Sequence, residues 1–343
     1  MQSKNLFVSD LQQGTAIEDL FLIAEARSAE TRNGQPYWDL VLQDATGKVS
    51  AKIWAPLSQQ ANGLAPGQFL HVQAKVELFR EKFQLNITRF EEIDPEGETL
   101  DWSAFVPRTA EAPETILEDL EHLCRDELHH KPWRALCRSV LRDPEIRQRL
   151  LQAPAAKSVH HAYRGGLLEH TRQVCRVCLQ FAALYPDLDK ELLFVAALFH
   201  DFGKAWELEG LATWDYSDAG QLLGHIHLGL ERLEPFLRRQ KGLDPELALH
   251  LKHAILSHHG ELEFGSPKRP KTPEAFALHF ADNLDSKLTT ASAALNDLGE
   301  HDGGWTPKVW ALQRQLFKRT PTPAPMATQH RPREDQCSLP LKE

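Results

Sequence analysis

The chain has 343 residues, enough for two domains with separate cores, and its 42% hydrophobic and 25% charged residues are ordinary for globular protein. The formal net charge of −9 excludes a protein that attracts nucleic acid over its whole surface, so local cations or bound metal would have to attract a polyanion. No apolar run reaches the ~18 residues of a membrane span. The N-terminus lacks the pattern of a secretory signal, and five cysteines give no disulfide framework. We therefore expect a cytoplasmic protein without a membrane partner.

Residues 1–95 are predicted to form a small β-barrel domain. Apolar and alternating runs indicate five short strands. We expect them at Ile17–Arg27, Tyr37–Leu42, Gly47–Trp54, Phe69–Leu78 and Phe83–Phe90. The stretch "PLSQQANGLAPG" after the third strand is a short helix or loop. This order of elements is typical of the OB-fold, a Greek-key barrel.

An OB-fold commonly binds single-stranded nucleic acid on the face of its second and third strands, with aromatic rings that stack on bases and cations that contact phosphates. The candidates for these roles are Tyr37, Trp38, Lys52, Trp54, Arg80 and Lys82. The alternative is that the aromatic residues belong to the barrel core and the cations are ordinary surface residues. Acidic residues slightly outnumber basic ones in this segment, so its composition gives only weak support for binding.

The rest of the chain is predicted to be helical, after a linker at residues 96–114 that carries Pro, Gly and acidic residues without periodicity. Residues 115–318 are expected to form an all-α domain, and the proline-rich residues 319–343 a disordered tail. The expected helices are Leu117–Leu128, Trp133–Leu141, Leu167–Leu184, Lys190–Phe199, Leu222–Arg238, Pro245–Leu256, Pro273–Leu288 and Pro307–Phe317.

One apolar helix ends in a pair of metal-ligand residue types. The stretch "LFVAALFHDFGKAWEL", residues 193–208, runs into His200 and Asp201. Gly203 could end the helix in a left-handed turn, and Lys204 adds a cation beside it. A helix cap or one satisfied core hydrogen bond would explain the pair alone, whereas a metal site needs further ligands elsewhere in the chain.

Such ligands recur along the helical part, each on or beside an apolar stripe. They are His170, the His200–Asp201 pair, His225, the His258–His259 pair and Asp282. Burying a polar group without a partner costs roughly 1–3 kcal/mol, and more for a charge. All these polar residues on apolar helices are explained together if they meet at one centre, where imidazoles and carboxylates surround a divalent ion. Cys175 and Cys178 resemble half of a zinc site, but their spacing fits the apolar face of a helix and no second such pair exists.

The order His, His-Asp, Asp resembles the HD-domain metal-dependent phosphohydrolases. The stretches "HHAYRGGLLEHT", "LFHDFGK", "LLGHI", "LSHHGELEFGSP" and "HFADNLDSK", after an OB-like domain, resemble the YhaM-type 3′→5′ exoribonucleases over most of the chain. The resemblance implies a nuclease that removes nucleotides from the 3′ end of single-stranded RNA, or also of single-stranded DNA, with the OB domain holding the strand.

The resemblance also implies a ligand set. One metal ion would be bound by His170, His200, Asp201 and Asp282. Asp201 would bridge to a second ion, held with His225, His258 and His259. The spacing alone leaves open whether His258, His259 or both bind metal, and whether Asp282 or Asp285 is the last ligand. We favour Asp282, which matches the last aspartate of the family.

Two ions about 3.5–4 Å apart can clamp a phosphodiester and activate a water molecule. Lys204 and Arg164 are the candidates for contacts with the non-bridging phosphate oxygens. Mixed His and carboxylate ligation suits Mn²⁺, Fe²⁺ or Co²⁺ better than Mg²⁺, and the family implies Mn²⁺ most often. The alternatives are a nucleotide or cyclic-nucleotide phosphohydrolase and a non-catalytic nucleic-acid-binding protein. The sequence does not fix the oligomeric state, and a homo-oligomer is among the expected states.

Overall fold

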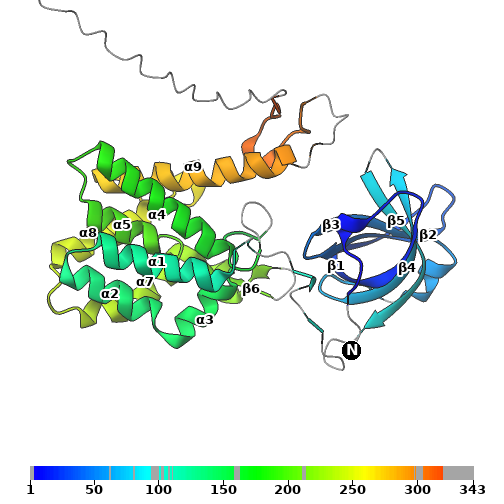
Figure 1. The fold of residues 1–343 in the computed structure, drawn as a ribbon, viewed down its shortest axis with the longest axis horizontal. Coiled ribbons are helices and arrows are strands. Elements are labelled where there is room, and N and C mark those ends of the chain that lie inside the picture. The colour runs from blue at the N-terminus through cyan, green and yellow to red at the C-terminus, as the bar shows by residue number, and fades with distance from the viewer. Residues whose placement is uncertain are drawn as a thin grey trace, which may run out of the picture. The chain divides into compact units, whose positions relative to one another are not determined.

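The computed structural model describes residues 4–61, 63–79, 82–93, 100–101, 104–106, 109, 111–157, 163–210, 214–296, 298 and 304–319. Among the features predicted above, Arg80, part of the linker and the tail from residue 320 lie outside these residues. Helices and strands are labelled as in Figure 1.

The N-terminal strands close into a five-stranded barrel (Figure 1). The strands are β1 (Ala16–Glu30), β2 (Pro36–Asp44), β3 (Gly47–Ile53), β4 (Phe69–Phe79) and β5 (Lys82–Ile93). Their order around the barrel is β1-β2-β3-β5-β4, and the β3–β5 pair that closes it is parallel. A 3₁₀ turn at Leu57–Gln60 follows β3. The predicted OB-fold is confirmed, and each strand overlaps the predicted run.

Alternation along the strands separates the barrel core from its outer face. Leu40 and Leu42 of β2 are fully buried in the barrel core, together with Ile53 of β3. Phe105, in the segment predicted as a linker, packs edge-on against Phe69 with ring centroids 4.9 Å apart. That segment therefore adds an aromatic side chain to the packing around the barrel.

The C-terminal part of the described chain is mostly helical (Figure 1). Its helices are α1 (Pro113–Glu127), α2 (Lys131–Leu141), α3 (Pro144–Gln152), α4 (Gly166–Leu184), α5 (Lys190–Phe199), α6 (Lys204–Glu207), α7 (Asp218–Arg239), α8 (Pro245–Ser257) and α9 (Pro273–Asn296). A two-stranded hairpin, β6 (Leu208–Glu209) and β7 (Asp215–Tyr216), lies between α6 and α7. Each predicted helix up to Pro273–Leu288 is present, whereas α3 and α6 were not predicted.

Helix α5 is the centre of the helical core. Its residues Leu192–Phe199 are all buried, and a helix that is apolar on every side is stable only when other helices surround it. Asp189 caps its N-terminus by accepting a hydrogen bond from the Leu192 amide. The packing of α5 therefore brings the residues that follow it, His200 and Asp201, into the interior.

The predicted helix Pro307–Phe317 is wrong. Antiparallel bridges join Trp305 to Phe317 and Val309 to Arg314, with a 3₁₀ turn at Trp310–Leu312 between them. Thr306 bonds to Leu316 at both its amide and its hydroxyl group, so the two ends of the segment meet. A helix of this length would hold its ends roughly 15 Å apart.

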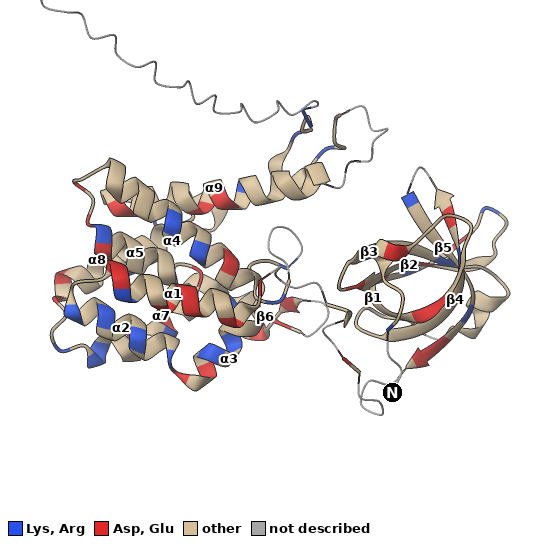
Figure 2. Cartoon of the chain, viewed as in Figure 1, with Lys and Arg blue, Asp and Glu red and all other residues tan. Residues whose placement is uncertain are grey.

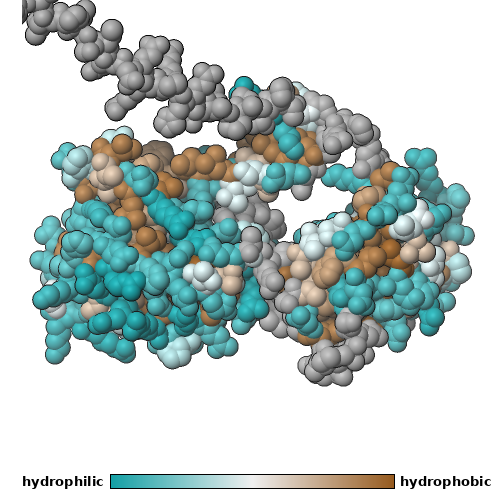
Figure 3. Space-filling model, viewed as in Figure 1, coloured by the Kyte–Doolittle hydropathy of each residue, from teal (hydrophilic) through white to brown (hydrophobic). Residues whose placement is uncertain are grey.

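Helix α9 carries an exposed apolar stripe at every fourth residue: Phe276, Phe280, Leu284 and Leu288. Figure 3 shows hydrophobic surface over this helix. Among the described residues, no helix combines the length and the apolar character that crossing a membrane requires.

Candidate metal centre

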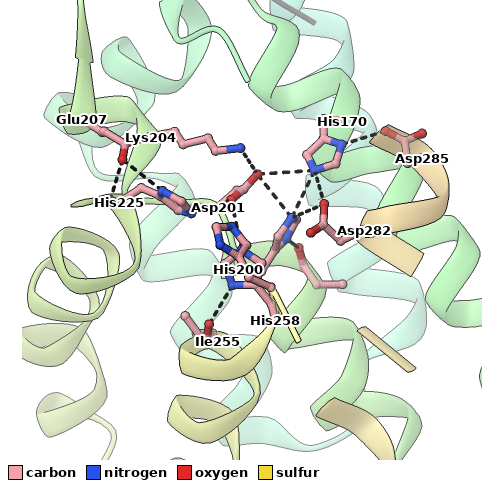
Figure 4. Close-up of polar contacts among 12 residues, drawn as sticks. His170, His200, Asp201, Lys204, Glu207, His225, Ile255, His258, Asp282 and Asp285 are labelled. Atoms are coloured by element: carbon pink, nitrogen blue, oxygen red, sulfur yellow. Dashed lines mark hydrogen bonds and ion pairs between the residues drawn. The ribbon is translucent and has the colours of Figure 1, made fainter. Parts of the chain in front are cut away.

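Seven predicted ligands from five helices meet in the helical core. We call His170, His200, Asp201, His225, His258, His259 and Asp282 the histidine–aspartate cluster. His170 lies on α4, His225 on α7 and Asp282 on α9, while the two adjacent pairs directly follow α5 and α8. Figure 4 labels His170, His200, His225, His258 and Asp282 around Asp201.

The first half of the cluster joins His170, His200, Asp201 and Asp282, whose ligand atoms all lie within 4.8 Å of one another. Nε2 of His170 lies 3.2 Å from Oδ1 of Asp282 and 3.4 Å from Oδ2 of Asp201. Nε2 of His200 lies 3.5 Å from the same Asp201 oxygen. These separations leave two imidazole nitrogens and two carboxylate oxygens facing one small volume.

The second half uses the other oxygen of Asp201. Oδ1 of Asp201 lies 3.3 Å from Nε2 of His225 and 3.5 Å from Nε2 of His258. His259 completes this group, whose ligand atoms also lie within 4.8 Å of one another. Asp201 therefore stands between the halves and presents one carboxylate oxygen to each.

The histidines are oriented by hydrogen bonds at their Nδ1 atoms. His200, His258 and His259 each donate from Nδ1 to a backbone carbonyl, and a carbonyl can only accept. The acceptors are Ala197 at 2.7 Å, Ile255 at 2.7 Å and Phe264 at 2.9 Å. In the neutral form of each ring the proton is thus on Nδ1, and Nε2 presents a lone pair to the cluster, as in metal-binding histidines.

The remaining two histidines are oriented by carboxylates. Oδ2 of Asp285 lies 2.7 Å from Nδ1 of His170. Oε1 of Glu207 lies 3.1 Å from Nδ1 of His225 and also accepts from the His225 amide at 2.9 Å. A carboxylate behind a ligating histidine fixes the orientation of the ring and increases its basicity.

The donor atoms of the second half fit a divalent cation. Oδ1 of Asp201 and Nε2 of His225 and His258 are buried and have no hydrogen-bond partner among the described residues. Each presents a lone pair, so together they repel one another unless a proton or a cation lies between them. Imidazole nitrogens combined with carboxylates are ligands for transition metals such as Mn²⁺, Fe²⁺ and Co²⁺.

Burial and neighbouring charges set the protonation of the cluster. Burial lowers the pKa of His200 to about 4. Burial, with the neighbouring His258 and His225, lowers the pKa of His259 to about 3. Both rings are therefore neutral at pH 7, which is the form that binds metal.

The carboxylate at the centre stays ionised despite its burial. Burial raises the pKa of Asp201, but Lys204 and His200 outweigh this effect and hold the pKa well below its ordinary value. Burial likewise lowers the pKa of Lys204, and the attraction of Asp201 more than compensates and raises it. Asp201 is thus an anion and Lys204 a cation at neutral pH.

His170 titrates differently because it contacts three carboxylates. Burial lowers the pKa of His170, but the hydrogen bonds with Asp201, Asp282 and Asp285 outweigh it and raise the pKa well above its ordinary value. A divalent cation would compete with this proton, since a ligating histidine must be deprotonated at Nε2.

Two glycines allow the cluster to close. Gly203 does not adopt the expected left-handed conformation: its φ of −66° is helical. A Cβ atom at Gly203 would instead lie 1.9 Å from the carbonyl oxygen of His225, so the missing side chain lets two backbones approach each other. Gly224, with φ 73°, interrupts α7 directly before His225. Glu207 then accepts the His225 amide hydrogen bond that the interrupted helix leaves open.

The geometry bears on the alternatives that the spacing left open. Asp282 faces the Nε2 atoms of the cluster, while Asp285 lies behind His170 on the Nδ1 side. Both His258 and His259 belong to the second half. The sequence interpretation missed the positioning residues Asp285 and Glu207, because no local pattern shows that they face a ring on another helix. The sequence "DNLDSK" does indicate Asp285 as an alternative to Asp282 for the last metal ligand.

Of the two predicted phosphate contacts, Lys204 belongs to the site. Its Nζ atom lies 2.6 Å from Oδ2 of Asp201, and its side chain is 15% exposed. Arg164 is exposed and precedes α4, the helix that carries His170. The cluster is not fully enclosed, because the side chains of Lys204, His225 (11% exposed) and Asp282 (15% exposed) are partly exposed.

On the barrel, part of the predicted binding face comes together. The rings of Tyr37 and Trp54 stack with centroids 4.9 Å apart, and Trp54 is 42% exposed. Lys52 lies beside them but pairs with Asp39 at 2.7 Å. Trp38 packs against the barrel core, so its position favours the core alternative over the expected contact with bases. Lys82 is exposed at the start of β5.

The chain is similar to two families of protein domains and to full-length enzymes. The family model for the HD domain matches residues 167–287, and that for the OB-fold nucleic acid binding domain matches residues 22–93. The chain is 30% identical to the 3′-5′ exoribonuclease YhaM of Oceanobacillus iheyensis over 89% of this chain and 94% of that protein. It is 32% identical to the 3′-5′ exoribonuclease YhaM of Bacillus subtilis over 89% of this chain and 95% of that protein.

Proposed function

The chain belongs to the YhaM family of 3′-5′ exoribonucleases, and we propose that it shortens single-stranded RNA from the 3′ end by metal-assisted hydrolysis at the histidine–aspartate cluster. The observation that carries the proposal is the pair of four-residue groups that share Asp201. In this proposal His170, His200, Asp201 and Asp282 hold one ion, and Asp201, His225, His258 and His259 hold the other.

Hydrolysis adds the oxygen of water to phosphorus and breaks one phosphorus–oxygen bond, and the departing oxygen takes up a proton. Bound divalent ions supply the chemistry for this reaction, since they lower the pKa of water and offset the negative charge of the transition state. The five imidazoles and two carboxylates hold the ions. Their Nδ1 partners keep the Nε2 lone pairs directed into the site before substrate arrives.

Lys204 has two roles in the proposal. Its ammonium group, 2.6 Å from Asp201, keeps the bridging carboxylate ionised. Its partial exposure also puts a cation at the edge of the cluster, where a non-bridging phosphate oxygen would approach. Arg164 is proposed for a second such contact because it lies on the segment that leads into α4.

Mn²⁺ is the ion we propose for the site, with Fe²⁺ and Co²⁺ as the next candidates. The donor set is rich in nitrogen, whereas Mg²⁺ prefers a shell of oxygens. Metal analysis of the purified protein, followed by titration of the metal-free protein with each ion, tests this identity. Tighter binding of Mg²⁺ than of Mn²⁺ would contradict it.

RNA is the proposed substrate, and Tyr37, Trp54, Lys52 and Lys82 are the proposed strand contacts on the barrel. The stacked pair Tyr37–Trp54 supports this role, since exposed aromatic rings bind bases of any sequence. Because RNA is a cytoplasmic substrate, we also propose a cytoplasmic location, which cell fractionation tests. The apolar stripe on α9 supports self-association, which the molar mass of the protein in solution tests.

The deciding experiment incubates the protein with Mn²⁺ and either a 5′-labelled single-stranded RNA or a panel of nucleotides and cyclic nucleotides. We expect a ladder of shortened RNA that disappears with a chelator and with Asp201→Ala. Hydrolysis of nucleotides alone would assign the chain to the phosphohydrolases with small substrates. No hydrolysis of either substrate by metal-loaded protein would identify a non-catalytic binding protein.

A further inference from the structure

A basic groove lies between α1 and α2, outside the metal centre. It is a hollow of about 430 Å³, lined among others by Arg125, Arg134, Arg138 and Arg142, and we call it the arginine groove. The only acidic residue in its described lining is Glu121, which is paired with Arg147 at 2.7 Å. In a chain of net charge −9, this is a strong local excess of positive charge.

The basic character comes from one face of α2. Lys131, Arg134, Arg138 and Arg142 recur at three- and four-residue spacing, so they line one side of the helix, opposite its buried residues Trp133, Leu136 and Val140. All four basic side chains are exposed. Figure 2 shows Lys and Arg gathered on α2.

Few of these cations are neutralised within the protein. Arg138 and Arg142 have no ion-pair partner in the part of the chain that the structure describes. Arg125 contacts Asp126 at 3.4 Å, but both side chains are more than half exposed, so the pair contributes little. Arg134 donates to the carbonyl oxygen of Leu128 at the end of α1, which holds its guanidinium group over the groove.

On the predicted binding face of the barrel, the cation nearest the stacked aromatic pair is already paired. Lys52, the cation beside the Tyr37–Trp54 pair, is neutralised by Asp39 at 2.7 Å. Stacking holds bases, whereas affinity for a nucleic acid backbone depends mainly on cations that contact phosphates. The arginine groove therefore supplies unpaired phosphate-binding cations in addition to Lys82 of the barrel.

We propose that the arginine groove binds backbone phosphates of the single-stranded RNA substrate, away from the nucleotide that is being removed. The inference rests on the proposed function for the identity of the polyanion. Guanidinium groups are suited to this ligand, because two parallel N–H groups match two phosphate oxygens. The groove shares no residue with the histidine–aspartate cluster, so it acts on binding of a long strand and not on the bond that is cleaved.

The test reverses the two unpaired charges in the full-length protein, Arg138→Glu with Arg142→Glu. Affinity for a fluorescent long oligoadenylate is measured in chelator, where no turnover occurs, and turnover of the long RNA and of a dinucleotide is measured with Mn²⁺. The matched control, Lys308→Glu with Arg314→Glu, changes the net charge equally at two exposed residues outside the groove.

We expect the groove variant to bind the long RNA roughly tenfold more weakly, and the slope of log Kd against log salt concentration to fall by about 1.4, which corresponds to two lost phosphate contacts. The groove variant should turn over the dinucleotide at the wild-type rate. The control variant should match wild type in every measurement. Unchanged affinity for long RNA would overturn the proposal. An equal loss on the dinucleotide, or an equal loss in the control, would overturn it too, because the effect would then be structural or due to net charge.

The milder pair Arg138→Gln with Arg142→Gln separates binding from a stabilising role of these arginines at the C-terminal end of α2. Weaker binding at unchanged melting temperature supports the groove, whereas a lower melting temperature at unchanged affinity refutes it. If the wild-type enzyme shortens RNA and the groove variants bind and shorten it equally well, only this inference is refuted. A wild-type protein without activity on RNA removes the proposed function instead.

Discussion

Asp285 lies directly behind His170: its Oδ2 atom is 2.7 Å from Nδ1 of the imidazole, whose Nε2 atom faces the cluster on the opposite side of the ring (Figure 4). Replacing Asp285 with Ala removes the group that holds this ring without removing a proposed ligand. We expect the affinity for the first metal ion to fall about 10- to 100-fold, the usual effect of losing such a partner.

Calorimetric titration of metal-free protein with Mn²⁺ measures this effect. Asp285→Asn is the matched control, since its amide oxygen still accepts the hydrogen bond and should restore part of the affinity. Wild-type affinity in Asp285→Ala would show that His170 needs no partner at Nδ1.

Glu207 has the corresponding role for the second half of the cluster. Its Oε1 atom accepts from both the amide and Nδ1 of His225, directly after the break in α7 at Gly224. Glu207→Ala should weaken the second ion about 10- to 100-fold and leave the first nearly unchanged. A two-step Mn²⁺ titration separates the two sites, and equal weakening of both ions would show that the halves are not independent.

Gly203 allows α6 to pack against the backbone of α7. In Gly203→Ala the new methyl group would overlap the His225 carbonyl oxygen, 1.9 Å away, which no side-chain rotation relieves. We expect the free energy of unfolding to fall by about 2 kcal/mol or more. Gly242→Ala is the control, because its methyl group would lie 3.6 Å from Pro132, an ordinary contact. Denaturant unfolding that shows similar stability for the two variants would contradict the close approach.

Trp54 is the exposed ring of the pair on the barrel face. Trp54→Ala should raise the Kd for single-stranded RNA roughly tenfold, since stacking on one base contributes about 1–3 kcal/mol. Trp310→Ala removes another exposed tryptophan and should bind RNA like wild type. Trp38→Ala should instead lower the melting temperature, because Trp38 packs on the barrel core. A Trp54→Ala variant with wild-type affinity for RNA would exclude the predicted binding face.

The sequence predicted those features that repeat locally. Alternation along β2 and the unbroken apolar run of α5 are set by burial, which leaves a periodic pattern in the chain. Helix α3 has only Ile146 and Leu150 buried, so its pattern was too weak to recognise. The helix predicted at Pro307–Phe317 is wrong for another reason. Hydrogen bonds between Thr306 and Leu316 determine the shape of this segment, and a local sequence pattern does not reveal such pairings.

The same limit applies to the candidate site. The predicted ligands could be named because each interrupts an apolar stripe or ends an apolar helix. Asp285 and Glu207 interact with histidines 115 and 18 residues away in the chain, so their roles appear only when the helices are packed together. The sequence suggests a left-handed turn at Gly203, whereas the structure shows that glycine is needed there because a neighbouring backbone lies too close for a side chain.

The most direct test of the two-ion centre is anomalous X-ray diffraction from crystals soaked in Mn²⁺. We predict two peaks about 3.5–4 Å apart on either side of the Asp201 carboxylate, one beside His170, His200 and Asp282 and the other beside His225, His258 and His259. A single peak that Asp201 does not contact, or no peak at the cluster at saturating Mn²⁺, would contradict the account.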